Sequence, residues 1–384
     1  MLSNRILLST HYFLYFGIMG VTLPYFNLYC YKLGFSGYEI GLLSAVKTMV
    51  SVVFGLFWGG IADFLGIRKQ LYIFCSFMGL LLFFFYLFVT DFKLVLLISV
   101  VYTMFYAPVI AFLEAFTMDC LDNKKVYGKI RLWGSISFII ISIIIGKLID
   151  LYSVKIILFA VLIGSLLQSL FSFSVPYVSH AKMENESKKL DWLLKPKLLI
   201  FLFCAFLMLV SHSTYYGYYS IYLENIGFDK TFIGITWAVA VMSEIIVMMK
   251  SDYIFKKFSL EIVLIFSFIA ASARWVIIGF SDNFLFLIIA QVFHAFTYGS
   301  FHMASIIYID RESSKNAKTI GQVINNGVTY GFGMMIGFLI NGFFYEYVKI
   351  SNLFFLSSFL AFIAFIVFGV SYIFFRDKKF IKNT

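Results

Sequence analysis

Five ionisable side chains lie within long apolar stretches of the sequence, where they could act on a bound molecule. Two are acids, Glu114 and Glu244, and three are bases, Lys47, Arg131 and Arg274. An ionised side chain at the centre of a bilayer costs about 3 kcal/mol, so such groups usually face a cavity and have partners. If Glu114 pairs with Arg131 and Glu244 lies near Arg274, Lys47 is left over. One spare cation favours an anionic ligand.

Two alternatives remain open for these charges. Lys47 could pair with Glu39, two helical turns away, or lose its proton on burial. Glu114 and Arg131 could form a purely structural salt bridge instead of contacting a ligand. Counting about 1.5 Å per residue from the ends of their spans places both of them nearer one end than the middle.

A polar stripe runs along the otherwise apolar residues 284–309. At about 100° per residue its members fall within an arc of roughly 80°, which predicts that they line a cavity: Gln291, His294, Tyr298, His302 and Ser305. Histidine changes charge near neutral pH and could relay a proton. For His302 we favour a neutral ring bonded to a neighbouring helix.

Glu244 is the better candidate for a proton carrier. A carboxyl group shielded from water holds a proton more readily, so it can load a proton on one side of a membrane and release it on the other. Arg274 and His294 are the candidate neighbours that would tune its proton affinity.

Residues 198–223 contain several tyrosines, of which we expect Tyr216 and Tyr219 to line a cavity. A tyrosine offers both an aromatic wall and a hydroxyl group, which suits an aromatic carboxylate. Since 21% of the chain is aromatic, ordinary core packing accounts for much of this run.

Long apolar helices must position these groups. The chain is 61% hydrophobic and 13% charged, with a mean hydropathy of +0.92, which leaves too little polar surface for a soluble globule. A span needs about 20 apolar residues, and barrel strands would be shorter and alternating. We therefore predict an all-α membrane protein with twelve transmembrane helices, at residues 9–31, 38–60, 70–90, 94–119, 129–149, 154–176, 198–223, 230–250, 259–280, 284–309, 319–345 and 351–375.

The two halves of the chain repeat each other. Residues 33–46 (LGFSGYEIGLLSAV) and 226–239 (IGFDKTFIGITWAV) share Gly-Phe, Ile-Gly and Ala-Val at an offset of 193. Tandem apolar halves predict two pseudo-symmetric six-helix bundles with a substrate site between them. We assign residues 1–176 to the first bundle, 177–197 to a cytoplasmic linker with a short surface helix at 190–194, and 198–384 to the second bundle.

The distribution of Lys and Arg predicts the orientation. With the amino terminus in the cytoplasm, most of these residues, including those of the linker and the C-terminal tail, fall on the cytoplasmic side. The few on the other side are Lys32, Lys93, Lys155, Lys230 and Lys349. The positive-inside rule then places both termini in the cytoplasm.

Several functional classes are disfavoured. The four cysteines show no C-x-x-C spacing, and no phosphate loop, dinucleotide fingerprint or H-E-x-x-H pattern occurs. We therefore expect no enzyme activity, no cofactor, no metal and no ATP-driven pumping, so a gradient must supply the energy. The net charge of +10 reflects topology and attraction to lipid, not binding of nucleic acid.

A motif, Gly59-Gly-Ile-Ala-Asp63-Phe-Leu-Gly66-Ile-Arg68-Lys69, stands between the second and third spans. It resembles the G-x-x-x-D-[RK]-x-G-[RK]-[RK] loop of the major facilitator superfamily, in which glycines let helix ends approach while the Asp and cations latch neighbouring helices. Phe64 occupies a usually basic position, which implies a weaker latch. From this motif, the twelve spans and the repeat, the chain is identified as a member of that superfamily, which implies the superfamily's fold. The resemblance also implies that the gating loop contains Gly59, Asp63, Gly66, Arg68 and Lys69.

Several further segments are spread over most of the chain: YGKIRLWGS at 127–135, Tyr215-Tyr216-Gly217, Trp237 with Glu244, Arg274-Trp275, and Gln291, His294, Thr297 and His302. Together they resemble the phenylpropionate permease group. That group is related to the lactose permease, and the resemblance implies that Glu114 and Arg131 bind substrate while Glu244, Arg274 and His294 take part in coupling.

The sequence departs from the lactose permease at other positions. Thr297 stands where that protein has a second acid, Gln291 and Tyr330 where it has lysines, and Tyr216 and Tyr219 where it has aspartates. Lactose is therefore disfavoured as the substrate.

The resulting expectation is a monomeric, multi-pass inner-membrane symporter that moves a small organic, aromatic anion with protons by alternating access. Its partners would be that small molecule, protons and the lipid bilayer. A proton-coupled sugar or nucleoside permease is the alternative, followed by a non-transporting membrane receptor. The residues expected to bind substrate are Lys47, Glu114, Arg131, Tyr216, Tyr219 and Gln291.

Overall fold

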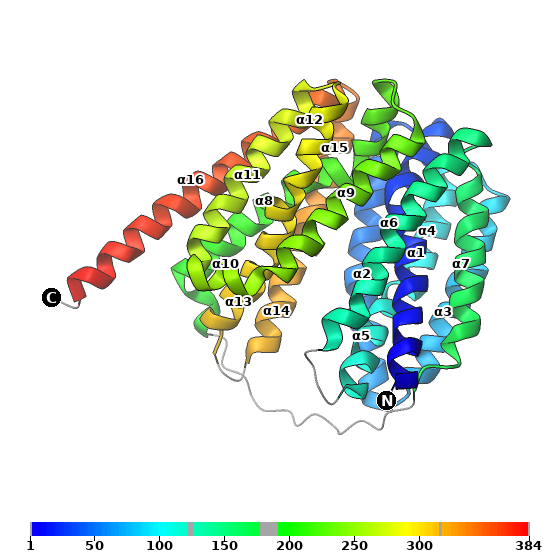
Figure 1. Cartoon of the computed structure of the whole chain (residues 1–384), viewed down its shortest axis with the longest axis horizontal. Coiled ribbons are helices and arrows are strands. Elements are labelled where there is room, and N and C mark those ends of the chain that lie inside the picture. The colour runs from blue at the N-terminus through cyan, green and yellow to red at the C-terminus, as the bar shows by residue number, and fades with distance from the viewer. Residues whose placement is uncertain (1, 122–125, 177–190, 315–316, 383–384) are drawn as a thin grey trace. The chain divides into compact units, whose positions relative to one another are not determined.

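The computed structural model describes residues 2–121, 126–176, 191–314 and 317–382, and every regular element in them is helical (Figure 1). The N-terminal half contains α1 (Leu2–Lys32), α2 (Gly37–Leu65), α3 (Arg68–Phe84), η1 (Phe85–Leu87), α4 (Phe92–Tyr106), α5 (Pro108–Cys120), α6 (Tyr127–Leu151) and α7 (Ile156–Ser172). The C-terminal half contains η3 (Asp191–Leu194), α8 (Pro196–Asn225), α9 (Lys230–Met249), α10 (Ser251–Lys257), α11 (Leu260–Phe280), α12 (Phe284–Val292), η4 (Ala295–Ser300), α13 (Phe301–Glu312), α14 (Lys318–Asn326), η6 (Gly327–Gly333), α15 (Met334–Tyr345) and α16 (Ile350–Lys382).

These helices account for all twelve predicted spans. Among the described residues, 11 helical segments are long and apolar enough to cross a membrane, and α7 is a shorter apolar helix of 17 residues. Helices suit this setting because lipid offers no partners for backbone amides and carbonyls. The prediction of an all-α protein with twelve apolar helices is confirmed.

Four of the predicted spans are not uniform α-helices. The third ends in the 3-10 helix η1. The fourth is divided into α4 and α5 at Pro108, which is the first residue of α5, where its missing N–H costs nothing. The tenth and eleventh contain the π-helical segments η4 and η6. Single π-turns inside α-helices are rare and occur often at functional sites.

The internal repeat is visible in the backbone. Gly34 and Gly227, 193 positions apart, both have a φ of 92°, a left-handed conformation that favours glycine. In each half the next amide bonds back to the carbonyl five residues earlier, at 3.2 and 3.0 Å. Ser36 and Asp229 then cap the following helix through their side chains. The same turn therefore recurs at the same place in both halves.

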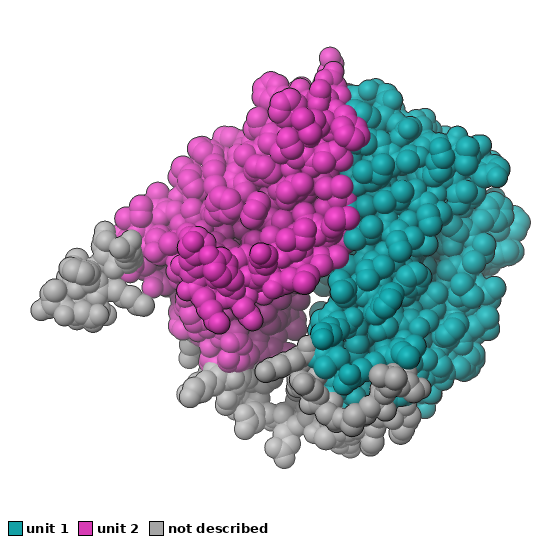
Figure 2. Space-filling view, in the orientation of Figure 1, with its two compact units in different colours: residues 1–185, 223–238 teal, residues 186–222, 239–384 magenta. Residues whose placement is uncertain are grey.

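The chain forms two compact units (Figure 2). Unit 1 comprises Met1–Asn185 and Leu223–Ala238, and in it α1 packs against α6 and α7. Unit 2 comprises Glu186–Tyr222 and Val239–Thr384, and in it α11 packs against α16 and η4. The proposed bundle limits stay a prediction, because linker residues 177–190 lie outside the described residues. At the end of the linker, a short helix was predicted at residues 190–194. The structure has the 3-10 helix η3 there.

Candidate substrate and coupling sites

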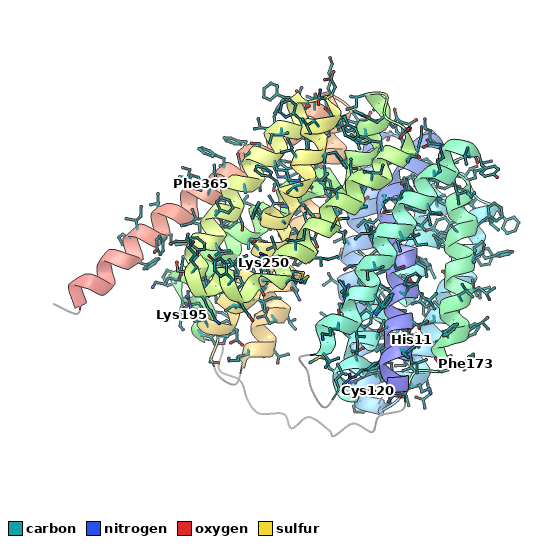
Figure 3. All side chains as sticks on the ribbon, viewed as in Figure 1. His11, Cys120, Phe173, Lys195, Lys250 and Phe365 are labelled. Carbon is teal, nitrogen blue, oxygen red and sulfur yellow. The ribbon has the colours of Figure 1, made fainter. Side chains whose placement is uncertain are left out.

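Unit 2 joins three of the ionisable residues singled out in the sequence. Glu244 on α9, Arg274 on α11 and His294 between α12 and η4 form one connected set. An Oε1 atom of Glu244 lies 2.6 Å from Nε2 of His294, and Nδ1 of His294 lies 2.5 Å from Nη1 of Arg274. Arg274 is fully buried and the Glu244 side chain is 19% exposed. Figure 3 shows the side chains of this unit, with Lys250 marking the junction of α9 and α10.

The donors and acceptors in this set define the protonation of His294. A guanidinium group can only donate, so Nδ1 of His294 must accept from Arg274. The remaining nitrogen, Nε2, then carries the hydrogen and donates it to the Glu244 carboxylate. A doubly protonated His294 would place two N–H groups against each other. The geometry therefore corresponds to a neutral His294 between an anion and a cation.

Arg274 is held in place by further polar partners. Its Nη1 donates to the Thr297 hydroxyl at 3.2 Å and its Nη2 to Oε1 of Gln291 at 2.9 Å. The amide of Gln291 donates in turn to the hydroxyl of Tyr219 at 2.7 Å. The guanidinium also lies 4.4 Å from the ring centroid of Tyr215. Gln291 and Tyr219, predicted to contact substrate, are fully buried here and position Arg274.

The predicted polar stripe of the tenth span runs through the π-helical segment η4. Before it, Gln291 and His294 face Arg274. Within it, Tyr298 stacks on His294 at 5.2 Å between ring centroids and, at 5.9 Å, on His302 of α13. Nδ1 of His302 lies 2.8 Å from the hydroxyl of Tyr330 on η6, which matches the favoured bonding of His302 to a neighbouring helix.

Tyr216 differs from its buried neighbours. Its side chain is half-buried, and its ring meets that of Tyr298 edge to face at 6.4 Å. Among the tyrosines singled out on α8, Tyr216 therefore offers exposed aromatic surface, whereas Tyr219 does not.

In unit 1, Lys47 on α2 rests against an aromatic ring. Its Nζ lies 4.3 Å from the ring centroid of Phe26 on α1. Within the described parts of the chain, Lys47 takes part in no ion pair. The alternative partner, Glu39, instead accepts the amide of Ser36 at 2.9 Å in the capping box of α2. The possible Lys47–Glu39 pair is thus not formed.

The pairing considered for Glu114 and Arg131 is also not formed. The guanidinium of Arg131 on α6 lies 3.7 Å from the ring centroid of Phe16 and 5.8 Å from that of Tyr12. Glu114 on α5 is exposed, and in the described regions no ion pair links it to Arg131. Flat stacking on an aromatic ring satisfies the guanidinium face and leaves its edge free to donate. Among the residues that the structure describes, neither Glu114 nor Arg131 forms a salt bridge.

The motif that joins α2 to α3 forms a charged connection to α5. Arg68 donates to Asp63 at 2.8 Å and to Asp119 at 2.7 Å. Gly66 ends α2 with a φ of 69°, and its amide bonds to the carbonyl of Ala62. Asp119, next to the Cys120 labelled in Figure 3, was not predicted. The sequence contained one indication of this contact: Asp119 ends the fourth predicted span, on the same predicted side of the membrane as Arg68.

Two other motif residues make fewer contacts. A Cβ added to Gly59 would meet open space within the described structure, so close helix approach does not require a glycine there. Lys69 is half-buried and forms no ion pair with any described residue.

The Arg68 connection leads to a stability prediction. We expect Arg68→Gln to destabilise the protein by about 1 kcal/mol, because two charge-assisted bonds are lost but Asp63 is 59% exposed. Thermal unfolding in detergent measures this change, with Lys69→Gln as the matched control. Equal melting temperatures for the two variants would mean that the connection contributes nothing.

Comparisons with known proteins agree with this architecture. The family model described as "MFS_1 like family" matches residues 5–356. A probable 3-phenylpropionic acid transporter of Escherichia coli (strain K12) is 26% identical over 352 residues, covering 89% of this chain and 91% of that protein. A putative nucleoside transporter of the same organism, YegT, is 26% identical and covers 82% and 78%.

A solved structure extends the comparison to the fold. The crystal structure of the nucleoside transporter NupG matches with a TM-score of 0.86, covering 96% of this chain and 99% of that one, at 18% sequence identity. At this identity the match establishes the fold alone. The predicted resemblance to the major facilitator superfamily is confirmed by the family match and this fold.

Proposed function

Because the chain belongs to the MFS_1 like family of membrane transporters, we propose that it carries a small organic anion together with a proton. The observation that carries this proposal is Lys47, a lysine within an apolar helix that rests on Phe26 and takes part in no ion pair among the described residues. An ammonium group placed so gains a charge-assisted contact when a carboxylate arrives. Arg131, stacked on Phe16, can donate to the same class of ligand.

The charge balance of unit 2 supports the proposed proton coupling. With Glu244 ionised, its charge offsets that of Arg274 through the neutral His294. A proton on Glu244 leaves the positive charge of Arg274 uncompensated. The protein then favours an anion most strongly when the proton is bound, and the two are carried together.

The proposed substrate is an aromatic acid. The named substrate of one relative is 3-phenylpropionic acid, and the cations of unit 1 lie beside aromatic rings that would also pack against an aromatic ligand.

A nucleoside or sugar is the second candidate. It is favoured by the internal charge balance between Glu244 and Arg274 and by relatives named as a nucleoside transporter and a maltose permease.

Uptake into proteoliposomes tests the substrate. With an inward proton gradient, we expect accumulation of labelled 3-phenylpropionate but little of its amide, uridine or maltose. Accumulation of uridine or maltose with no 3-phenylpropionate uptake would favour the second candidate and contradict the first.

We further propose that the protein is a monomer in the cytoplasmic membrane with both termini and the 177–197 linker inside. The distribution of Lys and Arg supports this orientation. A cysteine introduced by Asn185→Cys should resist an impermeant thiol reagent in intact cells and react after permeabilisation. Labelling without permeabilisation would reverse the orientation.

A further inference from the structure

Unit 1, teal in Figure 2, contains a segment of the C-terminal half, residues 223–238. This segment contacts α1 and α6. The segment comprises the end of α8, the turn at Gly227 and the first turns of α9. Its partners, among them Tyr25 and Asp150, lie toward the C-terminal ends of α1 and α6. The contact therefore lies at the end of unit 1 opposite the start of α1.

The carboxylate of Asp150 caps α9 from a distant part of the chain. One oxygen accepts the amide of Lys230 at 2.9 Å, and the other accepts the amide of Thr231 at 2.8 Å and its hydroxyl at 2.6 Å. These are the first amides of α9, which have no partner within their own helix. A negative charge at a helix N-terminus is also favoured by the helix dipole. Asp229 caps the same helix locally, so α9 has two caps.

Two glycines allow the backbones of α6 and α9 to touch. A Cβ on Gly146 would lie 2.3 Å from the carbonyl oxygen of Lys230, and one on Gly234 would lie 2.4 Å from that of Ser142. The hydroxyl of Tyr25 lies 2.8 Å from the Ser142 carbonyl and 3.0 Å from the Lys230 carbonyl. A larger residue at either glycine would force the helices apart.

Ion pairs surround this contact and contribute less. Glu224 pairs with Lys32 and, at 2.8 Å, with Lys230, and Tyr31 donates to Asn225 at 3.1 Å. The Lys32 side chain is 43% exposed, and exposed pairs are worth little. The cap and the glycine contact therefore dominate.

We propose that Asp150 is a positioning residue for transport: with Gly146 and Gly234 it holds the start of α9 on α6 and so stabilises one conformation of the transport cycle. No covalent link ties α9 to α6 here, so the contact can break and reform. Helix α9 also carries Glu244, about 20 Å along its axis from Lys230. Release of the cap would thus move the helix that bears the proposed proton carrier. The proposal rests on membership of the transporter family and not on the identity of the substrate.

Distances between spin labels test this directly. The labels are attached at positions 155 and 225, both exposed, in protein that lacks its native cysteines and is held in nanodiscs. We expect one short-distance population. Asp150→Ala should increase the ratio of a longer-distance population to the short one by about fivefold, the effect of losing one helix cap. Gly146→Val should make the longer population dominant.

Two control variants separate this effect from general destabilisation. Asp91→Ala removes a cap that is local to α4, where Asp91 accepts the amides of Lys93 and Leu94. Gly55→Val adds bulk where a Cβ meets open space in the described structure. Both should keep the short distance. If Asp150→Ala does not fold, Asp150→Asn, which keeps the shape but loses the charge, decides the question. An Asp150 variant and Gly146→Val with the same distances as the controls would overturn the proposal.

Discussion

Glu244→Gln is expected to abolish net accumulation of substrate while leaving exchange across the membrane intact. A glutamine is permanently neutral, so the site behaves as if its proton were always bound. The amide oxygen can still accept from Nε2 of His294, and the His294–Arg274 contact is kept. The carrier can then still change conformation with substrate bound, which permits exchange of substrate across the membrane. It cannot release a proton, so it cannot return without substrate. We expect proton-driven uptake to fall by about 100-fold.

Proteoliposomes loaded with 3-phenylpropionate measure both activities. Exchange is followed with labelled substrate at equal pH, and net uptake with an imposed pH gradient. Glu261→Gln is the matched control, since Glu261 is an acid of unit 2 that pairs with Arg311 at 2.5 Å. If Glu244→Gln still accumulates substrate against its gradient, Glu244 does not couple protons, and His294 becomes the next candidate.

Lys47→Gln is expected to weaken binding of 3-phenylpropionate by about 10- to 100-fold, the range for losing a hydrogen bond to a charged group. Binding of the corresponding amide, which has no negative charge, should change by less than about threefold. The difference arises because the lost contact joins an ammonium group to a carboxylate in a site shielded from water.

Isothermal titration calorimetry with the acid and the amide measures both affinities. Lys147→Gln provides the control, because Lys147 is a lysine of the same unit on α6 whose side chain is exposed. Equal losses of affinity for acid and amide would remove the argument for an anionic substrate and favour a nucleoside or sugar.

The sequence was sufficient to predict the helical architecture because each span is marked by its own composition. It also singled out Glu244, Arg274 and His294, since charged and polar residues in apolar helices need partners. The structure joins these three side chains in one network. The repeat predicted from residues 33–46 and 226–239 recurs as the same turn with the same φ.

Contacts that depend on helix rotation could not be predicted. Arg131 has an acid in the neighbouring span, yet its guanidinium stacks on Phe16, and a sequence does not show which face of a helix meets which ring. The π-helical segment η4, which contains Tyr298, has no mark in the composition of the sequence. Asp150 caps a helix 80 residues later in the chain, a separation at which spacing carries no information.

The central claim, that one proton is bound together with one anion, is tested most directly by counting protons during binding. Calorimetric titration of the purified protein with 3-phenylpropionate, in buffers of different ionisation enthalpy near pH 7.5, gives the number of protons taken up per ligand. We predict uptake of about one proton by the unmodified protein and none by Glu244→Gln. Binding of the anion to the unmodified protein without proton uptake would contradict the account.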